Sequence, residues 1–382
     1  MEVVFNKTGH FWFDCGLTGL IKMLEEIDLP KISTHIEDSK FVLDGAADDI
    51  KKALEDAFAL LVDRYYNLST KKQIDDRSSY NFYYDSQKDE FVSFPKKKAV
   101  GIAGIIFDKA ARPTKGMIKW KDPKKHILPD EYKHLQERME KYVKDNGLKI
   151  TTAGLLLDGP NAVQPKLKIA IGEKKRGKYC YLCGEETGSL EDANQTVFPF
   201  ITGSSGILSF NPNAGRPEKV CWRCFMLGKY VPVVGFYSTQ GDSLSIFLPY
   251  STSLKKMCQV HDLLESTKYQ DENLYRNFEH PLGGYYQHPY EVTYSFLYTL
   301  YDRCLLNRLE PGTDEIDLDV EAALDLTTNT APLEFYVIQT KKEGDTFSGK
   351  MIWPFKETLY FFRLHENIEK TIKIRMKEVL SY

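Results

Sequence analysis

The sequence has no long run of apolar residues and few cysteines for its length. No apolar stretch in its 382 residues approaches the ~18 residues that a membrane-spanning helix needs. The first 19 residues contain Asn, Lys, His and Asp where a secretory signal needs an apolar run. The seven cysteines are too few for a disulfide scaffold, and an odd number fits a reducing compartment. We therefore expect a cytoplasmic protein that has no membrane partner.

The motifs of common catalytic sites are also missing. The eight histidines are dispersed, and the chain contains no H-E-x-x-H, no G-x-S-x-G and no phosphate-binding P-loop. The two glycines in residues 100–107 have the wrong spacing for a dinucleotide-binding fingerprint. These absences favour a non-catalytic binding protein over an enzyme. A nuclease with carboxylates dispersed along the chain is the enzymatic alternative.

Positive charge is concentrated in one part of the chain. The formal net charge is only −3, which argues against a general polyanion binder. Residues 96–179, however, contain 21 Lys and Arg against 9 Asp and Glu, and residues 310–334 contain 8 acidic residues and no basic one. This asymmetry predicts a basic face toward nucleic acid and an acidic surface toward basic protein partners. A solvated lysine-rich surface is the alternative.

Helical and strand patterns occur along the whole sequence, which predicts an α+β fold. Apolar residues at helical spacing predict a first helix capped by Asp14. The same pattern predicts a last helix that buries Leu364 and Ile372 among other apolar side chains. Further helices are expected at 48–67, 129–145 and 289–308, and strands at 79–94, 231–249, 333–340 and 347–353.

Two cysteine pairs carry the clearest chemistry in the sequence. Both have the C-x-x-C spacing that points two sulfurs at one metal ion, and together they supply four thiolates: Cys180, Cys183, Cys221 and Cys224. A redox C-x-x-C needs no second pair. We therefore predict one tetrahedral zinc ion, which is structural because four sulfur ligands leave no open position for water.

The zinc segment lies near the middle of the chain and divides it. We expect an N-terminal α+β region with the basic segment at 1–175, a zinc-binding insertion and hairpin at 176–250, and a partly helical C-terminal region with the acidic segment at 251–382. The fold is then a mixed α+β domain with an inserted four-cysteine lobe.

Basic and amide side chains near the two C-x-x-C pairs, here called knuckles, are candidates for nucleic-acid contacts. The run before the first knuckle contains Lys174, Lys175, Arg176 and Lys178, which suit phosphate neutralisation. The glycine-rich loop between the knuckles contains Asn211, Asn213 and Arg216, and such side chains read base edges. Turn formation is the alternative explanation for the composition of that loop.

Three segments together resemble a known family. They are TGHFWFDCG at 8–16, the two C-x-x-C knuckles, and FPFITGSSG at 198–206 between them. The chain resembles, over about residues 1–30 and 176–250, the CXXC-CXXC family of CRISPR-associated proteins, the large subunits of type I Cascade complexes of the I-B and I-A-like kinds.

The resemblance implies a non-catalytic subunit of an RNA-guided antiviral surveillance complex. Family members sit at the 5′-handle end of the guide RNA, recognise the PAM in duplex DNA, aid R-loop formation and recruit the helicase-nuclease. The implied partners are the guide RNA, the target double-stranded DNA, the backbone and 5′-handle-capping subunits, and the helicase-nuclease.

The C-terminal region departs from the family pattern. Family members usually end in a helical bundle that contacts the non-target strand, whereas the last ninety residues here mix acidic stretches, two expected strands and one long helix. Strand holding is therefore not carried over to this region, and a separate small subunit could supply it. The alternative to the family reading is a stand-alone zinc-ribbon nucleic-acid-binding protein or regulator.

Overall fold

Helices and strands are mixed throughout the protein, which confirms the α+β class. The computed structural model describes residues 1–69, 71–108, 111–199, 219–265, 289–301, 333–344 and 346–372. By residue contacts the chain forms two compact units, one of residues 1–61, 101–106 and 167–382 and one of residues 62–100 and 107–166. The boundaries expected at 175 and 250 do not coincide with this division.

A central helix organises the first unit. Helix α1 (Phe11–Glu25) is buried at every residue from Trp12 to Leu24, so it lies inside the unit and not on its surface. Helices α2, α6 (Trp222–Leu227), α7 and α8 and strand β15 contact α1, and the same unit contains a three-stranded antiparallel sheet in the order β1-β3-β2. The bounds are β1 (Glu2–Asn6), β2 (Ser33–Ile36), β3 (Lys40–Asp44) and α2 (Ala47–Leu61).

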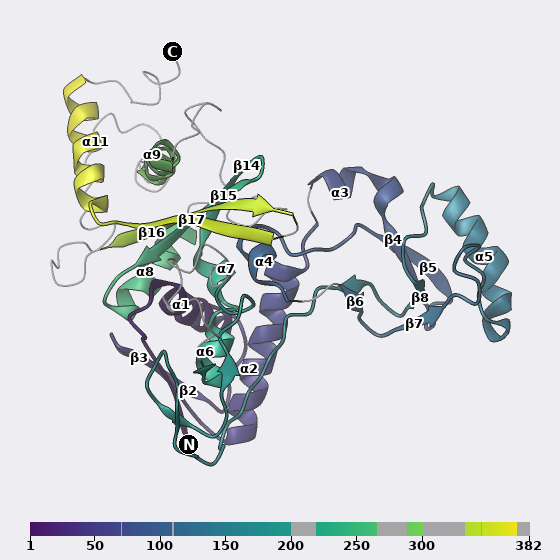
Figure 1. The fold of residues 1–382 in the computed structure, drawn as a ribbon, viewed down its shortest axis with the longest axis horizontal. Helices are drawn as coiled ribbons and strands as arrows, with labels where there is room; N and C mark the ends of the chain where they lie inside the picture. Colours follow the sequence, from purple (N-terminus) through teal and green to yellow (C-terminus); the bar gives the residue numbers. More distant parts are fainter. Residues whose placement is uncertain are drawn as a thin grey trace. The chain divides into compact units, whose positions relative to one another are not determined.

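A four-stranded antiparallel sheet in the order β14-β15-β16-β17 forms the rest of this unit's framework. Figure 1 shows α9 and α11 on one side of the sheet and α1, α7 and α8 on the other. Residues 243–250 pair with residues 334–341, so a domain boundary at 250 would separate paired strands. The elements are α4 (Gly101–Ile106), α7 (Val231–Val234), β14 (Phe236–Gln240), β15 (Ser243–Tyr250), α8 (Leu254–Glu265), α9 (Pro289–Leu300), β16 (Glu334–Glu343), β17 (Thr346–Phe355) and α11 (Thr358–Ile372).

The second unit is a small α/β layer structure. Its sheet has the order β5-β4-β8-β7, and Leu135 and Met139 of α5 pack into a core with Phe82, Ile118 and Leu155 from the strands. The elements are the π-helix Val62–Tyr66, α3 (Lys71–Asp75), the 3-10 turns Arg77–Ser79 and Asp130–Tyr132, β4 (Asn81–Asp85), β5 (Glu90–Phe94), β6 (Arg112–Pro113), β7 (Gly116–Lys119), α5 (Lys133–Asp145), β8 (Gly154–Leu157) and β9 (Asn161–Ala162).

Most expected elements are present, and three local predictions are wrong. His10, not Asp14, caps α1, because its ring accepts a hydrogen bond from the Trp12 N–H. Residues 231–234 form a short helix before the expected hairpin. In α11, Leu364 and Ile372 are 43% and 41% exposed, because the helix buries the face that carries Thr358, Phe362, His365 and Glu369 instead.

Polar residues explain the buried face of α11. His365 and Glu369 are buried there, and the Tyr301 hydroxyl donates a 3.2 Å hydrogen bond to the Glu369 carboxylate. The Phe361 ring lies 4.4 Å from the His365 ring. Hydrophobic periodicity cannot assign such a face.

Among the described residues, no helix combines the length and apolar character that crossing a membrane requires.

Candidate metal centre

The first cysteine pair lies at the tip of a hairpin. Strand β10 (Lys178–Tyr179) pairs with β11 (Glu186–Thr187), and the connecting turn is closed by a 2.9 Å hydrogen bond from the Gly184 N–H to the Cys180 carbonyl. Gly184 has a φ of 71°, which glycine adopts without the strain of a Cβ. This tight turn brings the sulfurs of Cys180 and Cys183 to one side.

The second pair lies at a helix N-terminus. Strand β13 (Lys219–Val220) pairs with β12 (Glu191–Asp192), and Cys221 then caps α6 (Trp222–Leu227). A 2.9 Å hydrogen bond from the Phe225 N–H to the Cys221 carbonyl forms the first helical turn, which places Cys224 on the same side as Cys221.

The two pairs meet in one cluster that could hold a metal ion. The four sulfurs lie within 4.8 Å of one another, and those of Cys183 and Cys221 are 3.8 Å apart. Cys180, Cys221 and Cys224 are buried, and Cys183 is partly exposed. The spacing in the sequence therefore identified four residues that are separated by up to 44 positions but adjacent in space.

Electrostatics within the cluster favour a cation. Hydrogen bonds among the four thiols lower the pKa of Cys180 and that of Cys221, the latter to about 7, and they raise the pKa values of Cys183 and Cys224. The four sulfurs therefore do not ionise together by themselves. A bound cation removes this conflict, because a coordinating thiol is deprotonated by the metal's charge.

Side chains around the cluster attach it to strand β1. The Arg223 guanidinium pairs with the Glu185 carboxylate, which also accepts a hydrogen bond from the Asn6 amide. The Trp222 ring meets the Phe5 ring edge-on at 6.0 Å. The four-cysteine segment is thus held to the N-terminal sheet by one polar network and one aromatic contact.

Close backbone packing joins the second knuckle to α1. A Cβ added at Gly16 would lie 2.8 Å from the Leu227 carbonyl carbon, and one added at Gly19 would lie 3.1 Å from that of Tyr230. Only glycine allows this approach. Sequence reasoning missed both roles, although two glycines three residues apart inside a helix are a signal for close packing.

The segment between the knuckles also contacts the start of α1. The Trp12 indole N–H donates a 2.9 Å hydrogen bond to the Val197 carbonyl. The Phe198 ring lies 5.2 Å from the His10 ring and 5.6 Å from the Trp12 ring. Two of the segments that carry the family resemblance therefore pack directly against each other.

Asp14 holds the loop before α1 in place. Its buried carboxylate accepts hydrogen bonds from the Thr8 N–H (2.7 Å), the Thr8 hydroxyl (2.9 Å) and the Gly9 N–H (3.1 Å). The Lys7 ammonium lies 3.1 Å from the same carboxylate and 4.3 Å from the Tyr250 ring centroid. Asp14 is thus a buried anchor of the segment 7–14.

The predicted nucleic-acid contacts before the first knuckle lie on the surface. Lys174, Lys175, Arg176 and Lys178 are all exposed, and within the described ranges no ion pair involves them. Asn211, Asn213 and Arg216, the residues predicted to read bases, lie outside the described residues.

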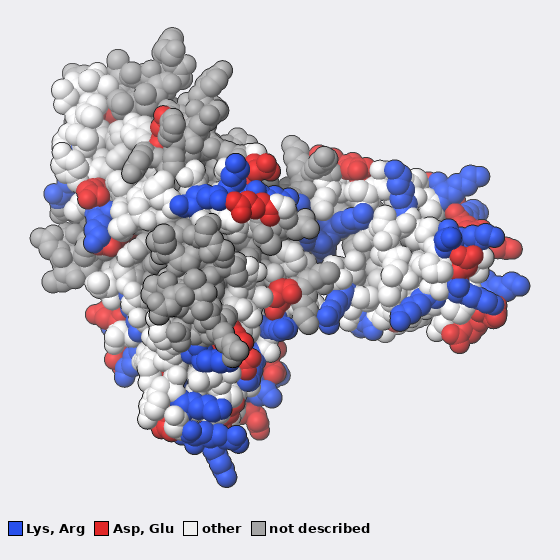
Figure 2. Space-filling model, viewed as in Figure 1, with Lys and Arg blue, Asp and Glu red and all other residues white. Residues whose placement is uncertain are grey.

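Much of the basic stretch belongs to the second unit. By sequence, residues 62–100 and 107–166 contain 21 Lys and Arg against 14 Asp and Glu, whereas the chain as a whole is net −3. The second unit therefore carries +7 and the first −10. Figure 2 shows the basic side chains interspersed with carboxylates and not gathered into one continuous patch.

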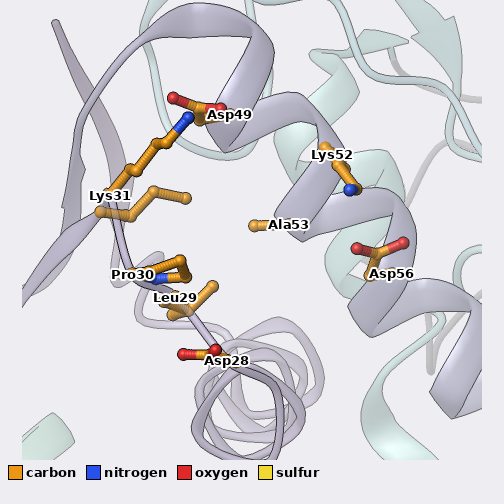
Figure 3. Close-up of a pocket in the computed structure, with 9 residues that line it drawn as sticks. Asp28, Leu29, Pro30, Lys31, Asp49, Lys52, Ala53 and Asp56 are labelled. Atoms are coloured by element: carbon orange, nitrogen blue, oxygen red, sulfur yellow. The ribbon is translucent and has the colours of Figure 1, made fainter.

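A pocket of about 290 Å³ lies in the first unit between residues 28–32 and helix α2. Asp28, Asp49, Asp56 and Lys52 line it together with Lys31, which extends toward Asp49 (Figure 3). Acidic and basic groups alternate around the pocket, and no cysteine or histidine lines it. No residue that the sequence singled out lies there.

Comparison with protein-family models and with curated proteins found no match to this chain.

Proposed function

We propose that the protein is a non-catalytic large subunit of a type I CRISPR RNA-guided surveillance complex. The observation that carries this proposal is the contact between two segments of the resemblance: the residues 8–16 and the start of 198–206 lie against each other through Phe198. A motif pair that packs as one structural element is better support than two separate sequence matches.

We further propose that the four-cysteine cluster holds Zn²⁺ as a structural ion in an inserted lobe. Four thiolates suit zinc, and a closed tetrahedral site leaves no position for a reacting water. The residues present would hold the ion, and its chemistry would be to fix the two knuckles against each other. The hydrogen bond from the Cys221 N–H to the Cys180 sulfur, at 3.3 Å, would orient a ligand sulfur in this arrangement.

The proposed task of the protein is PAM recognition in duplex DNA, followed by help in opening the duplex. Base pairing with the guide RNA reads most of the target, so the protein needs only a few base contacts and many phosphate contacts. The four exposed cations at 174–178 suit phosphates. Asn211 and Asn213 are the candidate base readers from the sequence, and the acidic segment 310–334 would face basic protein partners.

Affinity purification of the tagged full-length protein from its native cells tests this proposal. We expect co-purification of short RNAs with a common repeat-derived 5′ end, together with backbone-forming subunits. A strain that expresses the untagged protein is the control. Recovery of zinc-loaded protein without RNA or partners would contradict the surveillance-complex proposal and favour the stand-alone nucleic-acid-binding protein.

PAM reading at the loop has its own test. Replacing Asn211 or Asn213 by Ala should relax preference at one PAM position, by about 1–3 kcal/mol if a bidentate contact is lost. Equal weakening for all PAM variants would count against base reading by these residues.

A further inference from the structure

Two exposed tyrosines flank a buried metal ligand. Tyr179 is 65% exposed and Tyr181 is 49% exposed, whereas Cys180 between them is 2% exposed. Tyr179 is the last residue of β10, and Tyr181 begins the turn that the hydrogen bond from the Gly184 N–H to the Cys180 carbonyl closes. Cys180 must point at the other sulfurs, so both of its neighbours point outward. A tyrosine ring combines a flat apolar face with a polar hydroxyl, so it can stack on a ligand and still be solvated.

The backbone around this pair is held rigidly. The Tyr181 N–H donates a 2.9 Å hydrogen bond to the Lys219 carbonyl, and the Cys180 N–H donates one of 2.9 Å to the Glu185 carbonyl. Tyr179 belongs to the β10–β11 ladder opposite Glu186. A rigid support matters for a stacking surface, because the rings are then presented without a further loss of backbone entropy on binding.

The charges beside the tyrosines are basic and mostly uncompensated. Lys174, Lys175, Arg176 and Lys178 are exposed, and they make no ion pair within the described parts of the chain. Two nearby carboxylates are in ion pairs, Glu185 with Arg223 and Asp192 with Lys219. Two others accept hydrogen bonds from uncharged donors, Glu186 from the Gly177 N–H and Glu173 from the Ser189 hydroxyl, so the four cations still outnumber the carboxylates that have no charged partner.

We propose that Tyr179 and Tyr181 are a stacking site for unpaired bases of single-stranded nucleic acid, with the cations of 174–178 on its phosphates. This inference rests on the proposed function in taking the metal-bearing segment as a nucleic-acid surface. Exposed aromatic rings next to cations bind single strands in a sequence-tolerant way. In a duplex both faces of each base are already covered by its neighbours, so a duplex offers phosphates to this surface but no free base face.

Fluorescence anisotropy with the full-length, zinc-loaded protein tests the site. The probe is a labelled oligouridine of about 12 nucleotides, within the usual range of single-strand site sizes. Tyr179→Ala with Tyr181→Ala should weaken binding roughly 5- to 150-fold for each stacked base lost, and the salt dependence should stay unchanged. Tyr179→Phe with Tyr181→Phe should bind as the wild type does, because the rings remain.

Two matched variants separate stacking from charge and from exposure. Tyr360→Ala removes a tyrosine of α11 that is 68% exposed, and it should leave affinity unchanged. The triple variant Lys174→Ala, Lys175→Ala, Arg176→Ala should reduce the slope of the logarithm of the binding constant against the logarithm of the salt concentration by about 2, the value for three phosphates on a single strand. A second probe with abasic sites should lose the tyrosine contribution, so the wild type and the double Ala variant should bind it equally.

The outcomes are distinguishable. Unchanged affinity of the Tyr→Ala variant, together with weaker binding of the lysine variant, would overturn the stacking site and leave a purely ionic surface. Unchanged affinity of both would overturn the stacking site and also remove the nucleic-acid role of this segment. Absence of RNA in the purification from native cells would contradict the surveillance-complex proposal alone, since the oligouridine measurement does not depend on it.

Discussion

Replacing Gly16 by Ala gives a test in which local propensity and tertiary packing predict opposite signs. Glycine in a helix interior costs about 1 kcal/mol relative to alanine, so propensity alone predicts that Gly16→Ala stabilises α1. The added Cβ, however, would lie 2.8 Å from the Leu227 carbonyl carbon and would overlap the carbonyl oxygen. Ordinary non-bonded contact is about 3.5 Å, so α1 and the end of α6 must separate by at least about 0.7 Å.

The energetic consequence follows from that displacement. A gap of about 0.5–1 Å forfeits a quarter to a half of the dispersion energy of the atoms involved, and overpacking of a core costs about 1–3 kcal/mol. The clash is with backbone and not with a flexible side chain, so the upper part of this range applies. We expect a net loss of about 1–2 kcal/mol in the free energy of unfolding after the propensity gain.

Urea denaturation followed by tryptophan fluorescence measures this loss. Gly116→Ala is the matched control, because a Cβ there would lie 3.9 Å from the Leu157 side chain, an ordinary contact. Unfolding at lower urea for Gly16→Ala and little change for Gly116→Ala would support the packing argument. Stabilisation by Gly16→Ala would refute it.

Two further predictions concern the loop before α1. Asp14→Asn leaves the Lys7 ammonium, whose side chain is only 8% exposed, without its counter-charge. We expect urea denaturation to show a loss of about 3 kcal/mol in the free energy of unfolding. The control is the exposed ion pair of the N-terminus with Asp44, where Asp44→Asn should change the free energy of unfolding by about 0.5 kcal/mol or less. Equal effects would contradict the buried-anchor role. Burial lowers the pKa of His10 to about 4 from 6.5, so between these values the unfolded chain binds a proton that the folded chain does not, and stability falls as pH falls from 6.5 toward 4. His10→Asn keeps a capping side chain and should unfold with a smaller pH dependence over this window; an equal pH dependence in both proteins would be evidence against burial of a neutral His10.

The sequence predicted features that depend on nearby residues. The four cysteines were found because C-x-x-C spacing is a local signal. The strands expected at 333–340 and 347–353 are also present, in β16 and β17, which the structure pairs with each other.

The features that depend on distant contacts were not predictable in this way. The second unit is interrupted by residues 101–106, which belong to the first unit, and no composition change marks that exchange. The roles of Gly16 and Gly19 depend on the backbone of residues more than 200 positions away. The outward direction of Tyr179 and Tyr181 became visible only once Cys180 was placed among the sulfurs.

The metal content of the purified full-length protein, measured together with the reactivity of its thiols, tests the central claim most directly. Elemental analysis should find one zinc per chain. The four sulfurs of the cluster should resist alkylation until a strong chelator is added, and removal of the metal should unfold the segments around the two C-x-x-C pairs. A folded, metal-free protein whose cluster cysteines react freely with the alkylating reagent would contradict the account.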